Sequence, residues 1–244
     1  MGLASFIDLR VSVTEQFRLN VLNMAQTGLY LTYGKVTPWA NDAAPPNADS
    51  SIATVYDIWD NMIGGKQIGG GDFFQVIPRY DWMSGQSYFQ YDHSTPNLYE
   101  QPFYVVTSDN NVYKCIANNN GSVSTIKPTS VSPYIISETN DGYKWKYMYT
   151  ISNAEKTKFM TSNYIPVHYL YNDDASLQWQ VQTQAVPGAI NHIQLTNFGT
   201  NYTNANTIIV TVTGDGTGAL ASASVNNVSH TISSINILNA GQGY

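Results

Sequence analysis

The residues that could do chemistry begin with a glycine-rich stretch, Gly64–Gln67, which contains one lysine. In a phosphate-binding loop, backbone N–H groups and a lysine hold the phosphates of a nucleotide. That motif requires a glycine where Asp60 stands and a serine or threonine where Gln67 stands. Three more glycines, at residues 69–71, do not have the strand-then-helix context of a dinucleotide site. We therefore expect the first glycines to end a helix and residues 69–71 to form a turn.

Hydrolytic chemistry would need two placed carboxylates or an activated nucleophile. Two aspartate pairs are candidates for glycoside hydrolysis, Asp57 with Asp60 and Asp173 with Asp174. The first pair has helical spacing and is expected to cap a helix or face solvent, and the second lies in an ordinary turn sequence. No Gly-x-Ser-x-Gly motif marks a serine nucleophile.

Metal and thiol chemistry have no better support. The histidines show no metal-ligand spacing; they are His93, His168, His192 and His230. Cys115 is the single cysteine, so no intramolecular disulfide and no cysteine-based metal site can form. Its place in an apolar alternation predicts a buried side chain. We therefore predict no catalytic, cofactor-binding or metal-binding residues, no cofactor and no enzyme activity.

The composition favours binding to other proteins. Only 11% of the residues are charged, against about 25% in an ordinary soluble domain. The 18 tyrosines and 5 tryptophans are residue types favoured at interfaces, because they combine a large area with a polar group. The alternative is an extracellular β domain with a neutral polar surface. The net charge of −6 offers no surface that would neutralise nucleic-acid phosphates.

Targeting signals are absent from the given sequence. No basic segment followed by an apolar run marks a signal peptide, and no stretch approaches a membrane-spanning length of about 18 apolar residues. We therefore expect a chain that folds in a reducing cytoplasm, is not exported by a signal and has no membrane partner.

The N-terminal part is the most helical. Ser12 and Glu15 have capping-box spacing, in which each side chain satisfies a backbone N–H of the other's position. An apolar stripe at i, i+4 and i+7 follows: Phe17, Val21 and Met24. This pattern predicts a helix over residues 13–27, ended by Gly28. A second, shorter helix is expected over residues 50–63.

Beyond residue 73 the pattern is that of β-structure, because short aromatic and β-branched runs alternate with turn residues. The expected strands are residues 29–33, 73–78, 87–91, 104–107, 111–117, 144–151 and 164–171, with a helical turn at 154–160. The predicted fold class is mainly β, α+β in the N-terminal part, with sandwich- or barrel-like modules. We predict an N-terminal helix plus β domain at 1–100, an aromatic-rich β domain at 101–170 and a β repeat module at 171–244.

The last module contains an internal repeat. Residues 193–202 align with residues 235–244 at a constant offset of 42, and both copies carry an Asn-x-Gly-x-x-Tyr pattern. A glycine or asparagine stands wherever the turn would need a positive φ. Residues 207–213 are expected to form a hairpin with residues 219–225. The copies should pack on each other or on the first domain, and the module is expected to be cut at Tyr244.

Several blocks in residues 1–167 resemble the wedge proteins of T-even-type phage baseplates. The blocks are residues 39–46, 55–60, 76–85, 104–108, 112–115 and 141–150. Together they are similar to the small wedge subunit that forms a dimer at the periphery of the baseplate. The repeat module has no counterpart in this resemblance.

The resemblance implies a structural subunit of a contractile-tail baseplate wedge. Such a subunit would link neighbouring wedge proteins, form a homodimer within each wedge, and take part in baseplate assembly and rearrangement. It would be assembled in the host cytoplasm and reside in the virion tail. Two other hypotheses remain open: a receptor- or glycan-binding tail protein, with clustered aromatic residues flanked by carboxylates, and a lysozyme-like tail enzyme, with two carboxylates in a cleft.

Overall fold

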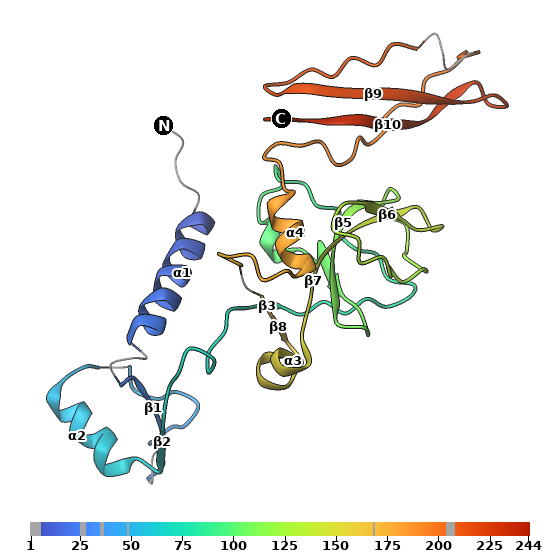
Figure 1. The fold of residues 1–244 in the computed structure, drawn as a ribbon. Coiled ribbons are helices and arrows are strands. Elements are labelled where there is room, and N and C mark those ends of the chain that lie inside the picture. Colours follow the sequence, from blue (N-terminus) through green and yellow to red (C-terminus); the bar gives the residue numbers. More distant parts are fainter. Residues whose placement is uncertain (1–5, 25–27, 35–36, 48, 168, 204–207) are drawn as a thin grey trace. The chain divides into compact units, whose positions relative to one another are not determined.

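The computed structural model describes residues 1–244 except 1–5, 25–27, 35–36, 48, 168 and 204–207. The chain divides into two compact units: unit 1 comprises Met1–Ile77 and Pro166–His168, and unit 2 comprises Pro78–Ile165 and Tyr169–Tyr244. The described part contains four α-helices and several antiparallel sheets (Figure 1). The predicted fold class, β-rich with an N-terminal helix, is confirmed. Among the described residues, no helix is both long and apolar enough to cross a membrane.

Unit 1 contains two helices and a small sheet. α1 (Phe6–Met24) is followed by β1 (Tyr30–Tyr33), then by α2 (Ile52–Asn61) and β2 (Gly64–Gln67), which pairs antiparallel with β1. The glycine-rich stretch is thus a strand that follows the helix. A Cβ on Gly64 would lie 2.7 Å from the Oη atom of Tyr33, so a larger residue there would have to displace the end of that side chain.

The turn expected at residues 69–71 is confirmed. The N–H of Asp72 donates a hydrogen bond of 3.0 Å to the C=O of Gly69 and closes this turn. α2 begins where a side chain can cap it: Ser51 accepts a hydrogen bond from the N–H of Thr54 at 3.2 Å.

The N-terminal helix begins earlier than predicted. α1 begins at Phe6, so Ser12 lies inside the helix and the predicted capping box is wrong. Residues 6–11 contain no glycine or proline that would prevent the helix from extending. The Glu15 carboxylate forms an ion pair with Arg18 instead, 2.7 Å from Oε1 to Nη2. It also accepts a hydrogen bond from Gln75 Nε2 at 2.9 Å.

The predicted apolar stripe of α1 is confirmed at one position and wrong at another. Val21 is buried at 7% exposure, but Phe17 is 66% exposed. The side chain of Met24 and the predicted helix end at residue 27 lie outside the described part of the chain.

The core of unit 2 is an antiparallel sheet of four strands in the order β4-β5-β7-β6. These are β4 (Tyr104–Val106), β5 (Asn111–Asn118), β6 (Ile136–Glu138) and β7 (Tyr143–Thr150). In β7 every second residue is aromatic, and successive side chains of a strand point to opposite faces. The aromatic side chains are therefore all buried: Tyr143, Trp145, Tyr147 and Tyr149.

Aromatic contacts fix this core. The ring of Trp145 stacks on Tyr143 with centroids 5.4 Å apart, and Tyr88 meets it edge-on at 5.7 Å. Such pairs contribute about 0.5–1.5 kcal/mol beyond their buried area. Cys115 joins the same cluster and has no exposed surface, which confirms the predicted buried thiol.

Shorter elements connect and cover the sheets. They are β3 (Val76–Pro78), the 3-10 helix η1 (Leu98–Glu100), α3 (Asn153–Phe159), β8 (Tyr164–Pro166) and α4 (Leu177–Thr183). β3 pairs with β8, and the chain passes between the two units within these strands. α3 confirms the predicted helical turn and has a genuine capping box at its start. The strand predicted over residues 87–91 does not form, and the one predicted over residues 164–171 is limited to β8 among the described residues, which exclude residue 168.

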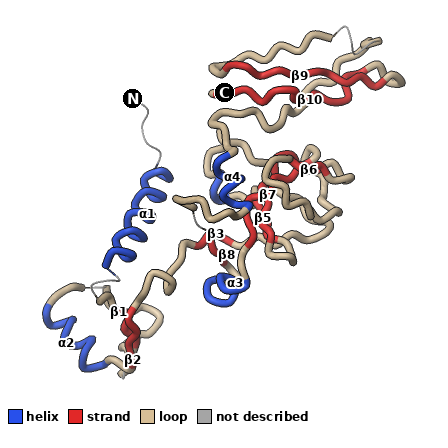
Figure 2. The backbone as a smooth tube through the Cα atoms, in the orientation of Figure 1, coloured by secondary structure: helices blue, strands red, loops and turns tan. Residues whose placement is uncertain are grey.

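The C-terminal residues form a long hairpin of β9 (Thr217–Asn226) and β10 (Thr231–Gln242), which pair antiparallel (Figure 2). The predicted hairpin between residues 207–213 and 219–225 is therefore wrong. Residues 208–213 are not a strand, and residue 207 lies outside the described part. The partner of β9 is β10.

The turn between β9 and β10 explains this pairing. The Asn226 Oδ1 atom accepts hydrogen bonds from the N–H groups of Val228 and Ser229, at 2.9 and 3.2 Å. His230 then adopts a positive φ of 56°, a conformation that residues other than glycine seldom adopt. The reversal is thus made by an asparagine side chain and a strained histidine, and not by the glycines at residues 214–218.

The two copies of the repeat adopt the same turn. Asn197 Oδ1 accepts a hydrogen bond from the N–H of Gly199 at 2.8 Å, and Asn239 Oδ1 accepts one from Gly241 at 3.0 Å. The φ angles of the two glycines are 60° and 64°. Both turns are thus made by an asparagine carbonyl and a left-handed glycine.

The tyrosine that closes each turn also contacts the equivalent glycine in both copies. A Cβ atom on Gly199 would lie 2.5 Å from Cε2 of Tyr202, and one on Gly241 would lie 2.8 Å from Cε2 of Tyr244. Each ring therefore lies directly over the glycine of its own copy.

Candidate interaction surfaces

The groups that could have done chemistry have local structural partners. Lys66 forms an ion pair with Asp72 in unit 1. Asp57 Oδ1 accepts a hydrogen bond from Asn61 Nδ2 at 2.9 Å. Asp173 and Asp174 accept hydrogen bonds from backbone N–H groups two residues further on, at 2.8 and 3.0 Å. These contacts fix a turn, a helix end and a loop.

The described residues also offer no arrangement for metal binding or for a reactive thiol. Within the part of the chain that the structure describes, no group of three or more His, Cys, Asp or Glu side chains could hold a metal ion. Burial raises the pKa of the Cys115 thiol to about 12, so the nucleophilic thiolate is scarce at neutral pH.

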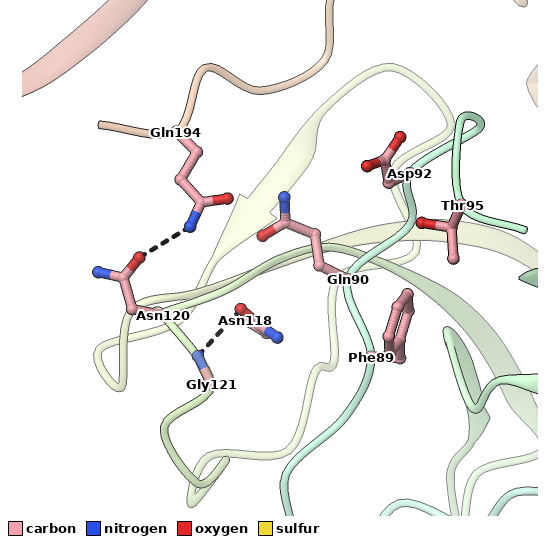
Figure 3. A pocket seen from close by; sticks show the side chains of 8 residues that line it. All are labelled: Phe89, Gln90, Asp92, Thr95, Asn118, Asn120, Gly121 and Gln194. Atoms are coloured by element: carbon pink, nitrogen blue, oxygen red, sulfur yellow. Dashed lines mark hydrogen bonds between the residues drawn. The ribbon is translucent and has the colours of Figure 1, made fainter. Parts of the chain in front are cut away.

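A polar pocket of about 350 Å³ lies beside the core sheet of unit 2 (Figure 3). Its lining residues are Phe89, Gln90, Asp92, Thr95, Asn118, Asn120, Gly121 and Gln194. Two hydrogen bonds hold the lining: Gln194 Nε2 donates to Asn120 Oδ1 at 3.0 Å, and the N–H of Gly121 donates to Asn118 Oδ1 at 3.1 Å. Among these eight residues there is one carboxylate and one aromatic ring. The lining thus lacks the two carboxylates of a glycosidase and the aromatic cluster expected of a glycan site.

The strongest surface feature is the apolar face of α2 in unit 1. It consists of Ile52, Val55, Tyr56 and Trp59, which follow the i, i+3, i+4, i+7 spacing of one helix face. Their exposed fractions are 75%, 46%, 66% and 65%. α2 contains no buried residue. The helix thus has a complete apolar face that nothing in the described structure covers.

β1 adds a second apolar surface in the same unit. Tyr30, Leu31 and Tyr33 are 62%, 59% and 64% exposed. Among the described residues up to Ile77, Val21 is the one side chain classed as buried. Full burial of a large apolar side chain stabilises a fold by roughly 1.5–3 kcal/mol. Most large apolar side chains of unit 1 are exposed and do not contribute this stabilisation. Large exposed apolar surfaces are typical of interaction sites.

No family model matches the chain. A curated relative, the baseplate wedge protein gp8 of Enterobacteria phage T4, is 32% identical over 87 residues. The match covers 30% of this chain and 26% of the relative, so the chain spans about a quarter of the length of that protein. The likeness to part of a baseplate wedge protein agrees in part with the resemblance found in the sequence.

Sequence reasoning predicted α2 but not its role. The sequence pattern placed Val55, Ile58, Trp59 and Met62 on one side of a short helix and did not identify Ile52 and Tyr56 as part of an exposed apolar face. The signal in the sequence was a surplus of apolar side chains over residues against which they could pack. Residues 50–63 are rich in large apolar side chains, but the neighbouring residues are turn formers. A loop of that composition offers no surface against which the helix could bury them.

Proposed function

We propose that this chain is a structural, non-enzymatic subunit of a contractile-tail phage baseplate wedge. In this role it links neighbouring wedge proteins and takes part in assembly and rearrangement of the baseplate. The exposed apolar face of α2 is the observation that carries the proposal, because it needs a partner to be buried. The likeness to a baseplate wedge protein supplies the setting, a virion tail assembled in the host cytoplasm.

The chemistry of α2 suits a protein partner. Tyr56 and Trp59 are residue types that dominate binding energy when they enter a partner's pocket. Asp57 lies on the opposite side of the helix from the apolar stripe. Asp60 follows Tyr56 by one turn and lies at the edge of the stripe, where its side chain is exposed. β1 adds the exposed side chains of Tyr30, Leu31 and Tyr33 to the surface that a partner could cover. A specific interface requires roughly 800 Å² per partner.

We propose two kinds of contact for unit 1. A second copy of the chain would form the homodimer within each wedge, and other wedge proteins would cover the apolar surface that remains. Of the sequence-predicted candidates, Asp57, Asp173 and Asp174 each accept a local hydrogen bond, and Lys66 forms an ion pair with Asp72.

The experiment compares two lysine substitutions on the same helix. Val55→Lys places a charge in the apolar face of α2, and Asp57→Lys places the same side chain on the opposite side of the helix. We expect Val55→Lys to weaken binding to copurified wedge proteins by about tenfold or more, because a charge would be buried unpaired. Asp57→Lys should bind like the parent. Light scattering of the chain alone reports the homodimer, and copurification reports the other partners.

Both variants should keep the parent's circular dichroism, since neither side chain is buried in the chain itself. Normal assembly of the Val55→Lys protein, with dimer and wedge contacts both intact, would remove α2 from the proposed interface.

A further inference from the structure

The last part of the chain, residues 187–244, has a backbone hydrogen-bond network of its own. We call it the C-terminal segment. The N–H of Ile190 donates to the C=O of Ala240 at 2.9 Å, and the N–H of Ile232 donates to the C=O of Phe198 at 2.9 Å, so the two repeat copies are bonded to each other. β9 and β10 pair within the same segment. These bonds hold the segment together without the core sheet.

Few polar contacts attach the C-terminal segment to the core sheet. Among the described residues, one hydrogen bond joins them: Gln194 Nε2 donates to Asn120 Oδ1 at 3.0 Å (Figure 3). Asn120 lies in the turn that follows β5, and both side chains are exposed. A hydrogen bond of this kind adds little to stability, because water competes for both amides. The attachment can therefore be shifted by a small change in free energy.

A cavity of about 220 Å³ lies between the core sheet and the C-terminal segment. Its titratable lining side chains are Glu138 of β6, Lys144 of β7 and His192 of the segment. Lys144 Nζ and Glu138 Oε2 form an ion pair at 3.3 Å. His192 is half-buried. A histidine thus lies where the segment meets a lysine and a glutamate of the sheet.

The neutral form of His192 fits this cavity better than the charged form. Burial lowers the pKa of the imidazole from its ordinary value of 6.5, and Lys144 lowers it further, while Glu138 acts in the opposite direction. When the segment leaves the sheet, the ring enters water and its pKa returns to the ordinary value. The released segment therefore binds a proton more readily than the attached one.

We propose that the C-terminal segment is a pH-sensitive arm, attached to the core sheet while His192 is neutral and released when His192 is protonated. The attachment is complete above about pH 6.5 and weakens as the pH falls below it. Between pH 7.5 and pH 5.5, one histidine can raise the ratio of released to attached chains by at most about tenfold. The inference does not depend on the baseplate role.

Fluorescence energy transfer in the complete chain measures the attachment. One dye is placed at Ile135→Cys, beside the core sheet, and the other at Val228→Cys, in the turn between β9 and β10; these side chains are 64% and 91% exposed. Cys115 has no exposed surface and is not labelled. Urea is added at pH 7.5 and at pH 5.5. Energy transfer reports release of the segment, and tryptophan fluorescence reports unfolding of the core separately.

We expect the segment to be released before the core unfolds, and at a lower urea concentration at pH 5.5 than at pH 7.5. His192→Gln should remove this pH difference, whereas His93→Gln, at an exposed histidine outside the cavity, should keep it. Lys144→Gln should reduce the difference and Glu138→Gln should enlarge it, because these neighbours act on the imidazole in opposite directions.

The proposal is overturned if the parent releases its segment at the same urea concentration at both pH values, or only together with core unfolding. It is also overturned if His192→Gln responds to pH as strongly as the parent. The parent comparison leaves the cavity unaltered, so it remains decisive even if a cavity variant fails to fold.

Discussion

A single carboxylate, that of Asp141, joins two segments of unit 2. Its Oδ2 atom accepts hydrogen bonds from the N–H groups of Thr125 and Ile126, at 2.7 and 3.0 Å. Its Oδ1 atom accepts one from the N–H of Tyr143 at 3.2 Å and one from the Thr139 hydroxyl. Partial burial alone would raise the pKa of this carboxyl, but the hydrogen bonds outweigh it and lower the pKa to about 2. The charged form therefore stabilises the folded state.

We predict that Asp141 makes the stability of unit 2 sensitive to acid. Its folded-state pKa is below the ordinary value of 3.8, so its contribution is complete above about pH 4 and is lost as the pH falls toward 2. Asp141→Asn should destabilise by roughly 1–2 kcal/mol at pH 7. Urea midpoints at pH 7 and pH 3 should differ less in this variant than in the parent.

The control for this comparison is Asp173→Asn, because Asp173 accepts a single backbone hydrogen bond in an exposed turn. It should keep the parent's pH dependence. An Asp141→Asn protein that loses stability in acid as steeply as the parent would show that other carboxylates carry the effect.

At the scale of elements, α1 buries one part of its apolar stripe and leaves another part exposed. Val21 is buried and Phe17, one turn earlier, is exposed. We predict that Val21→Ala destabilises the isolated chain by about 1–3 kcal/mol, while Phe17→Ala changes its stability by less than about 0.5 kcal/mol. Thermal melting of the two variants beside the parent measures both. An equal loss of stability in the two variants would indicate that the Phe17 side chain is buried in the isolated chain.

The elements that sequence reasoning found are those whose pattern has a single interpretation. β7 alternates aromatic and polar residues, and only a half-buried strand satisfies that alternation. α1 was predicted too short because Ser12 and Glu15 have capping-box spacing by coincidence. Inside a helix, the same spacing simply places two side chains on one face.

Other elements depended on contacts that no local pattern contains. α4 follows Ser176, which caps it by accepting a hydrogen bond from the N–H of Trp179 at 3.1 Å, but its alternating glutamines are typical of a strand as much as of a helix. The partner of β9 was mistaken because residues 207–213 have the same alternation as β10. In the structure the chain reverses between β9 and β10 with a positive φ at His230, which the residue type does not predict. The division into three domains stays a prediction.

At the scale of the whole molecule, the two units differ in where their apolar side chains go. Unit 2 buries an aromatic cluster around Trp145, which has no exposed surface. Unit 1 has a correctly capped helix and a paired strand but leaves their apolar faces open. Helices of this length are marginal on their own and gain most of their stability from packing. Unit 1 is therefore expected to be completed by its partners.

Hydrogen exchange measures this difference directly. Local opening costs from near zero up to the full free energy of unfolding, according to how much buried contact must be lost. We predict slow exchange at the amides of β5 and β7, and much faster exchange at those of β1, β2 and α2 in the isolated chain. In the assembled wedge, the exchange of α2 should slow by about tenfold for each 1.4 kcal/mol that its partner supplies. The β5 amides, already buried, serve as the internal control. Protection of α2 that is as strong in the isolated chain as in the assembly would mean that unit 1 is stable alone, and its apolar face would no longer require a partner.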